Sequence, residues 1–408
     1  MITVSNLTKQ YNAQASEWRI VCEIDTPFAR VNQLWFSVPE KFGNWLTDDV
    51  YDAFMIAMLF PAMYYNQDLR IIGHVSEKLY DNVTHYVQHC ENAYLPYLNK
   101  INVIVDGFSN TEKLDHMVGT GFSAGIDAFA TLYDRYVLEQ KDSYRISALF
   151  FFNVGSHGGG GDKAREKFWN RYNYLLPFTE ELALPFVPMD SNLFDFYKTE
   201  WEYDAGVLCR GIGILVFQKV LDKYYIAYDY SFWEIVHMTA ADYASITDIC
   251  NNYLLGTETL DIIVDGTQYR RSDKTIKLLE YSPFLKYLNV CVGNAASAKN
   301  CNYCHKCKRT LLTLDILNRL DDAQQVFDIA IFKKLRFGYK CYTVLHKKSD
   351  IYAHDNCQLA KKMNYPMPPY ILAWLYLSPT IIKGALIKMA KFILHRNANQ
   401  MNDRHYPV

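Results

Sequence analysis

The sequence predicts an α/β protein built on a doubly wound, mostly parallel sheet, and two observations lead to this fold class. From residue 113 onward, short apolar segments typical of strands alternate with longer segments of helical periodicity, the order that produces a parallel sheet. The segment "YRISALFFFNVG" also lacks polar alternation, as expected of a strand covered on both faces. The chain has 408 residues, enough for two or three domains, so further elements are expected on either side of this sheet.

Residues 1–112 are predicted to form an N-terminal α/β accessory domain. Its strand segments are rich in β-branched and aromatic residues, and its first long helix begins at a threonine followed by two acids, a common N-terminal signal. No motif for chemistry stands out in this part of the chain. The expected strands are "EWRIVCEIDT", "QLWFSVP", "DLRIIGHVS" and "INVIVDG", and the expected helices are "TDDVYDAFMIAMLFPAMYY" and "SEKLYDNVTHYVQHCENAYLPYL".

Residues 113–320 are predicted to form the central domain. Ligands of doubly wound sheets bind beyond the carboxyl ends of the strands, where the topology switches, so the loops after the first, second and fourth strands share one predicted rim. Strands are expected at "DHMVGTGFS", "YRISALFFFNVG", "LPFVPMD" and "KYYIAYDYSF", and helices at "GIDAFATLYDRYVLEQK", at 162–180 and at 196–221.

Residues 321–408 are predicted to form a basic, mainly helical C-terminal region. Residues 332–408 carry 13 Lys and Arg against three acids, a charge of +10, so the rest of the chain is acidic given the net charge of -2. Packing of this region on the chain's own acidic body is favoured, with a protein partner or an anionic membrane as alternatives. Within "PTIIKGALIKMAKFILHR", one predicted helical face carries Ile382, Leu386, Met389 and Ile393.

The sequence also indicates where the chain resides. The N-terminus "MITVSNLTKQYNAQ" lacks the charged and apolar regions of a signal peptide, and prolines interrupt the uncharged stretch 363–382, so no transmembrane segment is expected. A cytoplasmic location follows, where the ten cysteines stay reduced and clustered thiols indicate metal or redox chemistry. The acidic body and the lack of a recognition motif disfavour binding to nucleic acid.

The turn "GTGFSAGIDAF" is the first candidate for chemistry. A strand that turns through small residues into a helix directs several backbone N–H groups and the positive end of the helix dipole at one spot, which suits a phosphate. No lysine follows the glycine, so this is not a Walker loop, and an ordinary strand–turn–helix is the plainer alternative. The turn resembles the S-G-G-x-D-S phosphate loop of the ATP-pyrophosphatase group. This resemblance implies phosphate binding by Ser123, Ala124, Gly125, Ile126, Asp127 and Ala128.

Four cysteines form the second candidate, with the spacing C-x9-C-x2-C-x2-C. Closely spaced thiols in a reducing compartment suit tetrahedral Zn²⁺, and four sulfur ligands leave no position for a catalytic water, so the zinc is expected to be structural. An iron–sulfur cluster and unrelated reduced thiols remain as alternatives. The predicted ligands are Cys291, Cys301, Cys304 and Cys307.

Together, the two motifs resemble those of the 7-cyano-7-deazaguanine synthases and their relatives in the ATP-pyrophosphatase superfamily. The resemblance covers residues 113–320. It includes an R-x-x-K pair before the first cysteine, Arg271 with Lys274, and "CHKCKRT" at the end of the cysteine motif. It implies a Rossmann-like domain that uses ATP, Mg²⁺ and Zn²⁺. In the phosphate loop, alanine replaces the second glycine and the final serine of the family pattern, at Ala124 and Ala128.

The resemblance implies an ATP-dependent C–N ligase that releases AMP and pyrophosphate. Such an enzyme adenylates a carboxylate, and ammonia or an amine then displaces AMP. Catalysis consists mostly of positioning and charge neutralisation at the α-phosphate. Asp127, as a partner of Mg²⁺, and Arg271 and Lys274, as the neutralising cations, are the candidate catalytic residues. The acceptor is a small-molecule or protein carboxylate of unknown identity, and a homodimer is left open.

Other interpretations remain at this point. The chain could carry out another reaction of the same group, such as amidotransfer to a sugar or thiolation of tRNA. Ala124 and Ala128 also fit a catalytically decayed nucleotide-binding scaffold, and surface charges are the plainer interpretation of Arg271 and Lys274. Weaker candidates, expected to touch a ligand or to face the rim, are His157, Asp162, Asp229, Ser231, Glu258 and Asp265.

Overall fold

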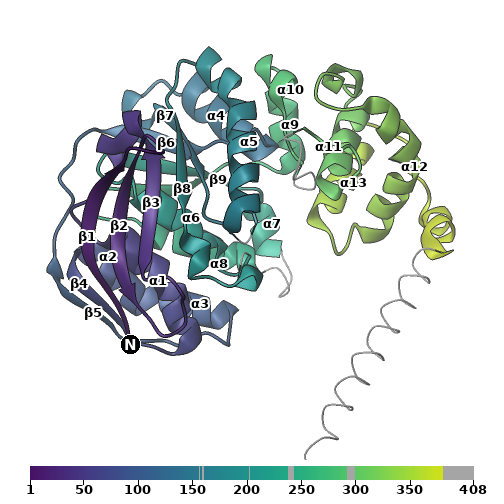
Figure 1. The fold of residues 1–408 in the computed structure, drawn as a ribbon. Helices are drawn as coiled ribbons and strands as arrows, with labels where there is room; N and C mark the ends of the chain where they lie inside the picture. The colour runs from purple at the N-terminus through teal and green to yellow at the C-terminus, as the bar shows by residue number, and fades with distance from the viewer. Residues whose placement is uncertain (156, 159, 202, 238–242, 292–298, 380–408) are drawn as a thin grey trace, which may run out of the picture. The chain divides into compact units, whose positions relative to one another are not determined.

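The computed structural model describes residues 1–155, 157–158, 160–201, 203–237, 243–291 and 299–379, and the chain divides into two compact units, Met1–Lys299 and Asn300–Val408. The first unit is built around one large sheet, and the described part of the second is helical (Figure 1). The predicted α/β class and mostly parallel sheet are confirmed. The finer division into residues 1–112, 113–320 and 321–408 stays a prediction.

The sheet has ten strands in the order β10-β9-β6-β7-β8-β3-β2-β1-β4-β5. Neighbouring strands from β10 to β8 are all parallel. The chain adds β7 and β8 on one side of β6 and then returns to place β9 and β10 on the other side, so the topology switches between β6 and β9. These five strands are β6 (Met117–Gly121), β7 (Ala148–Phe152), β8 (Phe186–Ser191), β9 (Leu221–Ala227) and β10 (Asp261–Asp265).

The N-terminal strands continue the same sheet. β3 (Gln33–Pro39) is antiparallel to β8, with Phe36 opposite Ser191 and Ser37 opposite Asp190. Antiparallel pairing links β3 to β2 and β2 to β1, while β4 and β5 extend the sheet in parallel with β1. Strand β1, at the very start of the chain, is not among the predicted strands. The remaining bounds are β1 (Ile2–Asn12), β2 (Glu17–Asp25), β4 (Leu69–Val75) and β5 (Val103–Phe108).

Strand β7 shows how the parallel half of the sheet is covered on both faces. Successive side chains of a strand point to opposite faces. Phe150 packs against Phe217 and Tyr224, with ring centroids 5.0 and 5.8 Å apart, whereas Phe151 stacks on Phe168 at 5.3 Å. Its first four residues are buried, which confirms the prediction made from its unbroken apolar sequence.

Helices cover the sheet of the first unit. α5 matches the helix predicted at 162–180, but the helix predicted at 196–221 is wrong in extent. The described residues of that range form a 3-10 turn at Thr199–Trp201 and then α6, before β9 begins at Leu221. Tyr197 and Trp201 of this segment both pack against Phe60 and against each other. The helices are α1 (Asp52–Tyr65), α2 (Glu77–Asn82), α3 (Gln88–Tyr94), α4 (Ile126–Leu132), α5 (Gly161–Glu181), α6 (Gly206–Leu215), α7 (Phe232–His237), α8 (Tyr243–Leu254), α9 (Arg271–Leu278) and α10 (Pro283–Tyr287).

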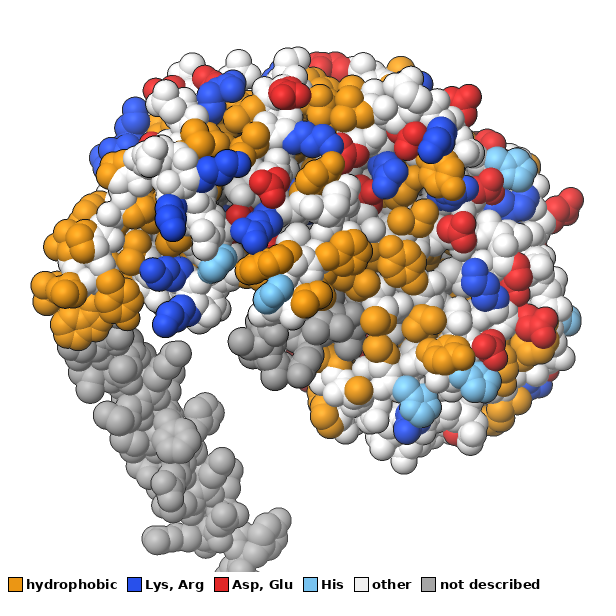
Figure 2. Space-filling model, turned by 180° about the vertical axis from the view of Figure 1, so that it is seen from behind, with side chains coloured by type: hydrophobic (Ala, Val, Ile, Leu, Met, Phe, Trp, Pro, Cys, Tyr) orange, Lys and Arg blue, Asp and Glu red, His pale blue; other side chains and the backbone are white. Residues whose placement is uncertain are grey.

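The second unit contains α11 (His305–Ile316), α12 (Ile329–His346), α13 (Ile351–Lys362) and a further helix at 370–379. Asp328 and Asp350 cap α12 and α13 by accepting hydrogen bonds from backbone N–H groups of the first turn. Its surface in Figure 2 carries many Lys and Arg side chains and an apolar cluster. The predicted apolar face from Ile382 to Ile393 lies outside the described residues. Over the described ranges, no helix is both long and apolar enough to cross a bilayer.

Candidate nucleotide site and cysteine cluster

The carboxyl ends of the parallel strands place several predicted residues at one edge of the sheet. Because β6, β7 and β9 run in the same direction, the loops that follow them begin at the same edge. The turn at Ser123–Asp127, which resembles a phosphate loop in sequence, follows β6. The glycine-rich segment follows β7, and Tyr228 follows β9. The switch between β6 and β9 is where doubly wound sheets form a crevice for ligands.

The turn after β6 has a specific backbone conformation. Ser123 is exposed, and its hydroxyl accepts a hydrogen bond from the Gly125 N–H at 3.4 Å. Ala124 has a φ of 56°, in the left-handed region that glycine adopts without strain. Gly125 is then extended and precedes the first residue of α4, Ile126. The turn therefore places an alanine in a backbone conformation that favours glycine.

The three candidate catalytic residues meet in one ion-pair cluster. Asp127, in the first turn of α4, has its Oδ2 2.5 Å from the Arg271 Nη1 and its Oδ1 3.0 Å from the Lys274 Nζ. The ammonium group of Lys274 also donates to the backbone carbonyl of Tyr228, which follows β9. The Lys274 side chain is 1% exposed, and those of Arg271 and Asp127 are 10% and 17% exposed. Charged side chains from the first turns of α4 and α9 thus form ion pairs with one another beside the switch point.

A second group of ion pairs joins Asp134 and Arg135, in the helical segment that begins with α4, to α9 and to the end of β10. Asp265, the last residue of β10, is buried and accepts hydrogen bonds from the Arg135 Nε at 2.8 Å and the Thr131 hydroxyl at 3.0 Å. One turn further along α9, Lys277 pairs with Asp134. Burial raises the pKa of the Asp134 carboxyl, and the contact with Lys277 partly offsets this rise. The Lys277–Asp134 pair holds α9 against the helical segment that begins with α4, and the Asp265 contacts hold the end of β10 against the same segment, which accounts for Asp265 in structural terms.

The four predicted cysteines lie together. Each offers one sulfur atom, and the four sulfurs all lie within 4.8 Å of one another. A tetrahedral zinc site with Zn–S bonds of about 2.3 Å has sulfur atoms roughly 3.8 Å apart, close to the 3.9 Å between the sulfurs of Cys301 and Cys307. The backbone N–H groups of Cys304 and Cys307 point at the sulfurs of Cys301 and Cys304, at 3.3 and 3.5 Å. The cluster could therefore hold a metal such as zinc, with four sulfur ligands.

Two neighbouring residues define the surroundings of these cysteines. His305 lies inside the motif, but its Nε2 is 3.3 Å from an oxygen of Asp350 and its Nδ1 is 3.4 Å from the Tyr339 hydroxyl. It is thus engaged by α12 and α13 and is not part of the sulfur cluster. Two residues before Cys291, the Asn289 N–H donates to the Ala124 carbonyl at 2.8 Å. The segment that leads to Cys291 is therefore hydrogen-bonded to the turn after β6.

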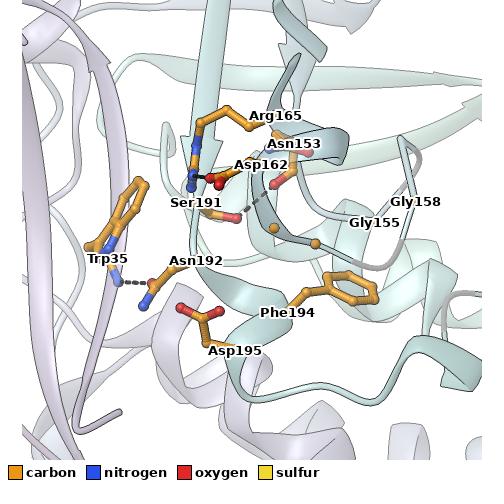
Figure 3. A pocket seen from close by; sticks show the side chains of 12 residues that line it. Trp35, Asn153, Gly155, Gly158, Asp162, Arg165, Ser191, Asn192, Phe194 and Asp195 are labelled. Atoms are coloured by element: carbon orange, nitrogen blue, oxygen red, sulfur yellow. Dashed lines mark hydrogen bonds and ion pairs between the residues drawn. The ribbon is translucent and has the colours of Figure 1, made fainter. Parts of the chain in front are cut away.

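A polar pocket of about 260 Å³ lies further along the same edge, beyond β7 and β8, and was not predicted (Figure 3). Trp35 of β3 and Asn192 form one side of it, and Phe194 lies on the other. Arg165 pairs with Asp190 at 2.5 Å on the wall. Asp162, one of the weaker candidates, lines this pocket.

The other weaker candidates have structural surroundings. His157 is buried against Phe151 and Phe168, and burial, helped by the charges of Arg171 and Lys167, lowers the pKa of its imidazole to about 3. The Ser231 hydroxyl and N–H both bond the Glu234 carboxylate, at the start of α7.

Glu258 was expected at the rim, and this prediction is wrong. It precedes β10 and therefore lies at the amino end of that strand, where it accepts hydrogen bonds from the Ser76 hydroxyl and the Lys78 N–H at the start of α2. Asp229 follows β9 as expected, near Tyr228.

Fold and site together define an α/β protein with a large, mostly parallel sheet and a cysteine cluster suited to a metal such as zinc. Comparison of the chain with protein-family models, with curated proteins and with solved structures found no match.

Proposed function

We propose that this chain is an ATP-dependent ligase that adenylates a carboxylate, releases pyrophosphate and joins the acyl group to ammonia or an amine. The observation that carries the proposal is the meeting of Asp127, Arg271 and Lys274 at the switch between β6 and β9. The two cations are 144 and 147 positions away from Asp127 in the sequence. Only the fold brings them to the turn that resembles a phosphate loop.

The charges of the cluster suit a polyphosphate. The guanidinium of Arg271 can bind two phosphate oxygens at once, and the ammonium of Lys274 acts as a point charge. Both side chains are largely removed from water, which strengthens their attraction for an anion that enters the site. Ser123 is exposed at the same turn and offers a hydroxyl to a phosphate.

Asp127 has the right chemistry for Mg²⁺, a hard cation that prefers carboxylate and phosphate oxygens. When bound, Mg²⁺ would neutralise charge on the phosphates. Both carboxylate oxygens of Asp127 are bonded to basic side chains in the structure. In the proposed reaction, Arg271 and Lys274 turn toward the phosphates, and a carboxylate oxygen of Asp127 becomes accessible to the metal.

The proposed reaction has two balanced steps. An acceptor carboxylate oxygen attacks the α-phosphorus of ATP, and the bond to pyrophosphate breaks. The nitrogen lone pair of ammonia or an amine then attacks the acyl carbon, the acyl C–O bond to AMP breaks, and the nitrogen loses a proton to solvent. Both steps develop negative charge on phosphate oxygens, and Arg271 and Lys274 are positioned to stabilise it.

A second candidate function is a nucleotide-binding subunit without turnover. Ala128 stands in the place of the family's final serine and has no hydroxyl to offer a phosphate. Its side chain is 5% exposed and packs in the core. The ion pairs of Asp127 are also complete without a ligand. Such a subunit would bind ATP through Ser123, Gly125, Arg271 and Lys274 but would not release pyrophosphate.

Titration calorimetry with ATP and Mg²⁺, followed by a pyrophosphate-release assay over a panel of carboxylates and amines, tests the proposal. The ligase predicts binding and carboxylate-dependent pyrophosphate release, both weakened in Asp127→Asn. Asp106→Asn serves as the matched control, because Asp106 forms an ion pair with Arg70 on β4, outside the site. Binding without pyrophosphate release across the panel would support the subunit function. No binding at millimolar ATP would contradict both.

A further inference from the structure

The helix at 370–379 in the second unit presents an unusual apolar surface. Six of the seven side chains from Tyr370 to Tyr376 are large, apolar or aromatic, and exposed, with Ile371 72% and Trp374 51% exposed. Monomeric soluble proteins rarely expose contiguous apolar surface of this kind unless it contacts a partner or a membrane. The exposed residues are Tyr370, Ile371, Leu372, Trp374, Leu375 and Tyr376.

The inner face of this helix is already packed. Ala373 is fully buried in a small core with Cys341 and Val344 of α12, and Leu377 packs against the same core. The ring of Tyr376 meets Phe337 edge-on at 5.0 Å. One face of the helix therefore packs within the second unit, and the exposed side chains lie on its other faces.

The charge of the surrounding sequence is one-sided. No Asp or Glu occurs between Asp355 and Asp403, whereas this interval contains six basic residues. Lys361 and Lys362, at the end of α13, are exposed. On the neighbouring α12, Lys334 is also exposed. The apolar helix thus lies within an acid-free, basic part of the chain.

We propose that the helix at 370–379, together with Lys361 and Lys362, binds the surface of an anionic lipid bilayer. A protein groove typically receives one apolar stripe of a helix, but here every outward side chain from Tyr370 to Tyr376 is apolar or aromatic. Trp and Tyr favour the boundary between lipid headgroups and acyl chains, and nearby lysines add attraction to anionic headgroups. No described helix is long and apolar enough to span a bilayer, so the contact is with its surface.

Sedimentation of the full chain with lipid vesicles tests this proposal. Vesicles of phosphatidylcholine alone are compared with vesicles in which about a third of the lipid is phosphatidylserine, at low and high salt. The chain is expected to sediment with the anionic vesicles and to be released by high salt, because surface charges are screened. The double substitution Ile371→Glu with Leu375→Glu is expected to lower the bound fraction about tenfold or more.

Two further variants keep the test specific. Tyr203→Glu replaces another highly exposed side chain, 88% exposed, in the first unit, and should bind vesicles like the unchanged protein. Lys361→Gln with Lys362→Gln should weaken binding to anionic vesicles by a few-fold, because each lysine near the surface contributes to the attraction. Unchanged circular dichroism of each variant verifies folding. No sedimentation with anionic vesicles would overturn the proposal, as would a stable dimer in solution that the double substitution dissociates.

Discussion

Asp127 and Asp52 both lie in the first turn of a helix of the first unit, yet they have different kinds of partner. Asp127, in the parallel half of the sheet, is bonded to a guanidinium and an ammonium group. Asp52, packed in the N-terminal half, accepts hydrogen bonds from the Ser76 N–H at 2.8 Å and the Gln218 amide at 2.9 Å, which are neutral groups. Burial raises the pKa of the Asp52 carboxyl to about 7, and its hydrogen bonds only partly offset the rise.

We interpret the contrast between Asp127 and Asp52 as one between a ligand-binding site and a structural contact. Under the proposed function, Asp127 exchanges its two cations for a metal and a phosphate. A fully buried carboxylate with neutral partners has no comparable exchange open to it, and its contribution is to the stability of the fold. We therefore expect substitutions at the parallel edge to affect ligand binding, and substitutions in the N-terminal half to affect stability.

The largest expected effect is on turnover. Arg271→Ala should lower the rate of pyrophosphate release by about 10²–10³-fold, because it removes a preorganised cation from the developing phosphate charge. Arg70→Ala, which breaks an ion pair with Asp106 in the N-terminal half, should leave the rate within about twofold, since exposed ion pairs contribute little. Steady-state assays of the two variants decide the comparison. Equal losses would remove the distinction between the two halves.

Metal content provides the next contrast. Cys307→Ser removes a buried sulfur from the cluster and should cost most of the bound zinc and a few kcal/mol of stability. Cys22, on β2, is equally buried but belongs to no cluster in the described part of the chain, and burial raises the pKa of its thiol. Cys22→Ser should therefore leave the zinc content unchanged. Elemental analysis of the purified proteins measures both; equal zinc contents would contradict a metal at the cluster.

The pH dependence of unfolding tests Asp52 directly. The pKa of the Asp52 carboxyl is ordinarily 3.8 and rises to about 7 in the folded state, so the folded state holds an extra proton between these values. Stability from this group is therefore complete below about pH 4 and falls as the pH rises toward 7. Relative to Asp52→Asn, the unchanged protein should lose about 3 kcal/mol between pH 5 and pH 8. Urea unfolding at several pH values measures the difference, and parallel curves would refute the assignment.

The smallest effect concerns backbone strain. Ala124 has a φ of 56°, and Ala124→Gly should raise stability by up to about 1 kcal/mol by relieving the left-handed conformation. Asn66, which ends α1 with a φ of 51°, is the matched position in the N-terminal half. Asparagine tolerates this conformation, so Asn66→Gly should change stability by less than about 0.5 kcal/mol. Denaturant midpoints compare the two, and a loss of stability in Ala124→Gly would contradict the strain.

Local sequence patterns predicted those parts of the fold that depend on local order. The unbroken apolar run of β7 and the alternation of strands and helices indicated the parallel sheet, and the spacing of four cysteines indicated the metal cluster. Asp127, Arg271 and Lys274 were named from a motif resemblance, and the fold brings them into contact.

Other features depend on pairing between distant segments, which one sequence does not reveal. The pocket beside Trp35 requires β3 to pair with β8, more than 150 residues away, as the hydrogen bond from the Trp35 N–H to the Asn192 side chain shows. Glu258 was assigned to the wrong edge of the sheet. It precedes β10 and so lies at the amino end of that strand, whereas the predicted rim is at the carboxyl ends. The start of the chain alternates weakly in polarity, so strand β1 gave no clear signal.

The antiparallel junction of β3 with β8 has a consequence for how this protein can diversify. One wall of the pocket, at Trp35, belongs to a strand that enters from the N-terminal segment, while the ion-pair cluster of Asp127 belongs wholly to the parallel strands and their helices. Substitutions in β3 would reshape the cavity and leave the ion-pair cluster of Asp127 intact. Under the proposed function, changes that alter the shape of the pocket and changes that alter phosphate binding would therefore fall on different strands of one sheet.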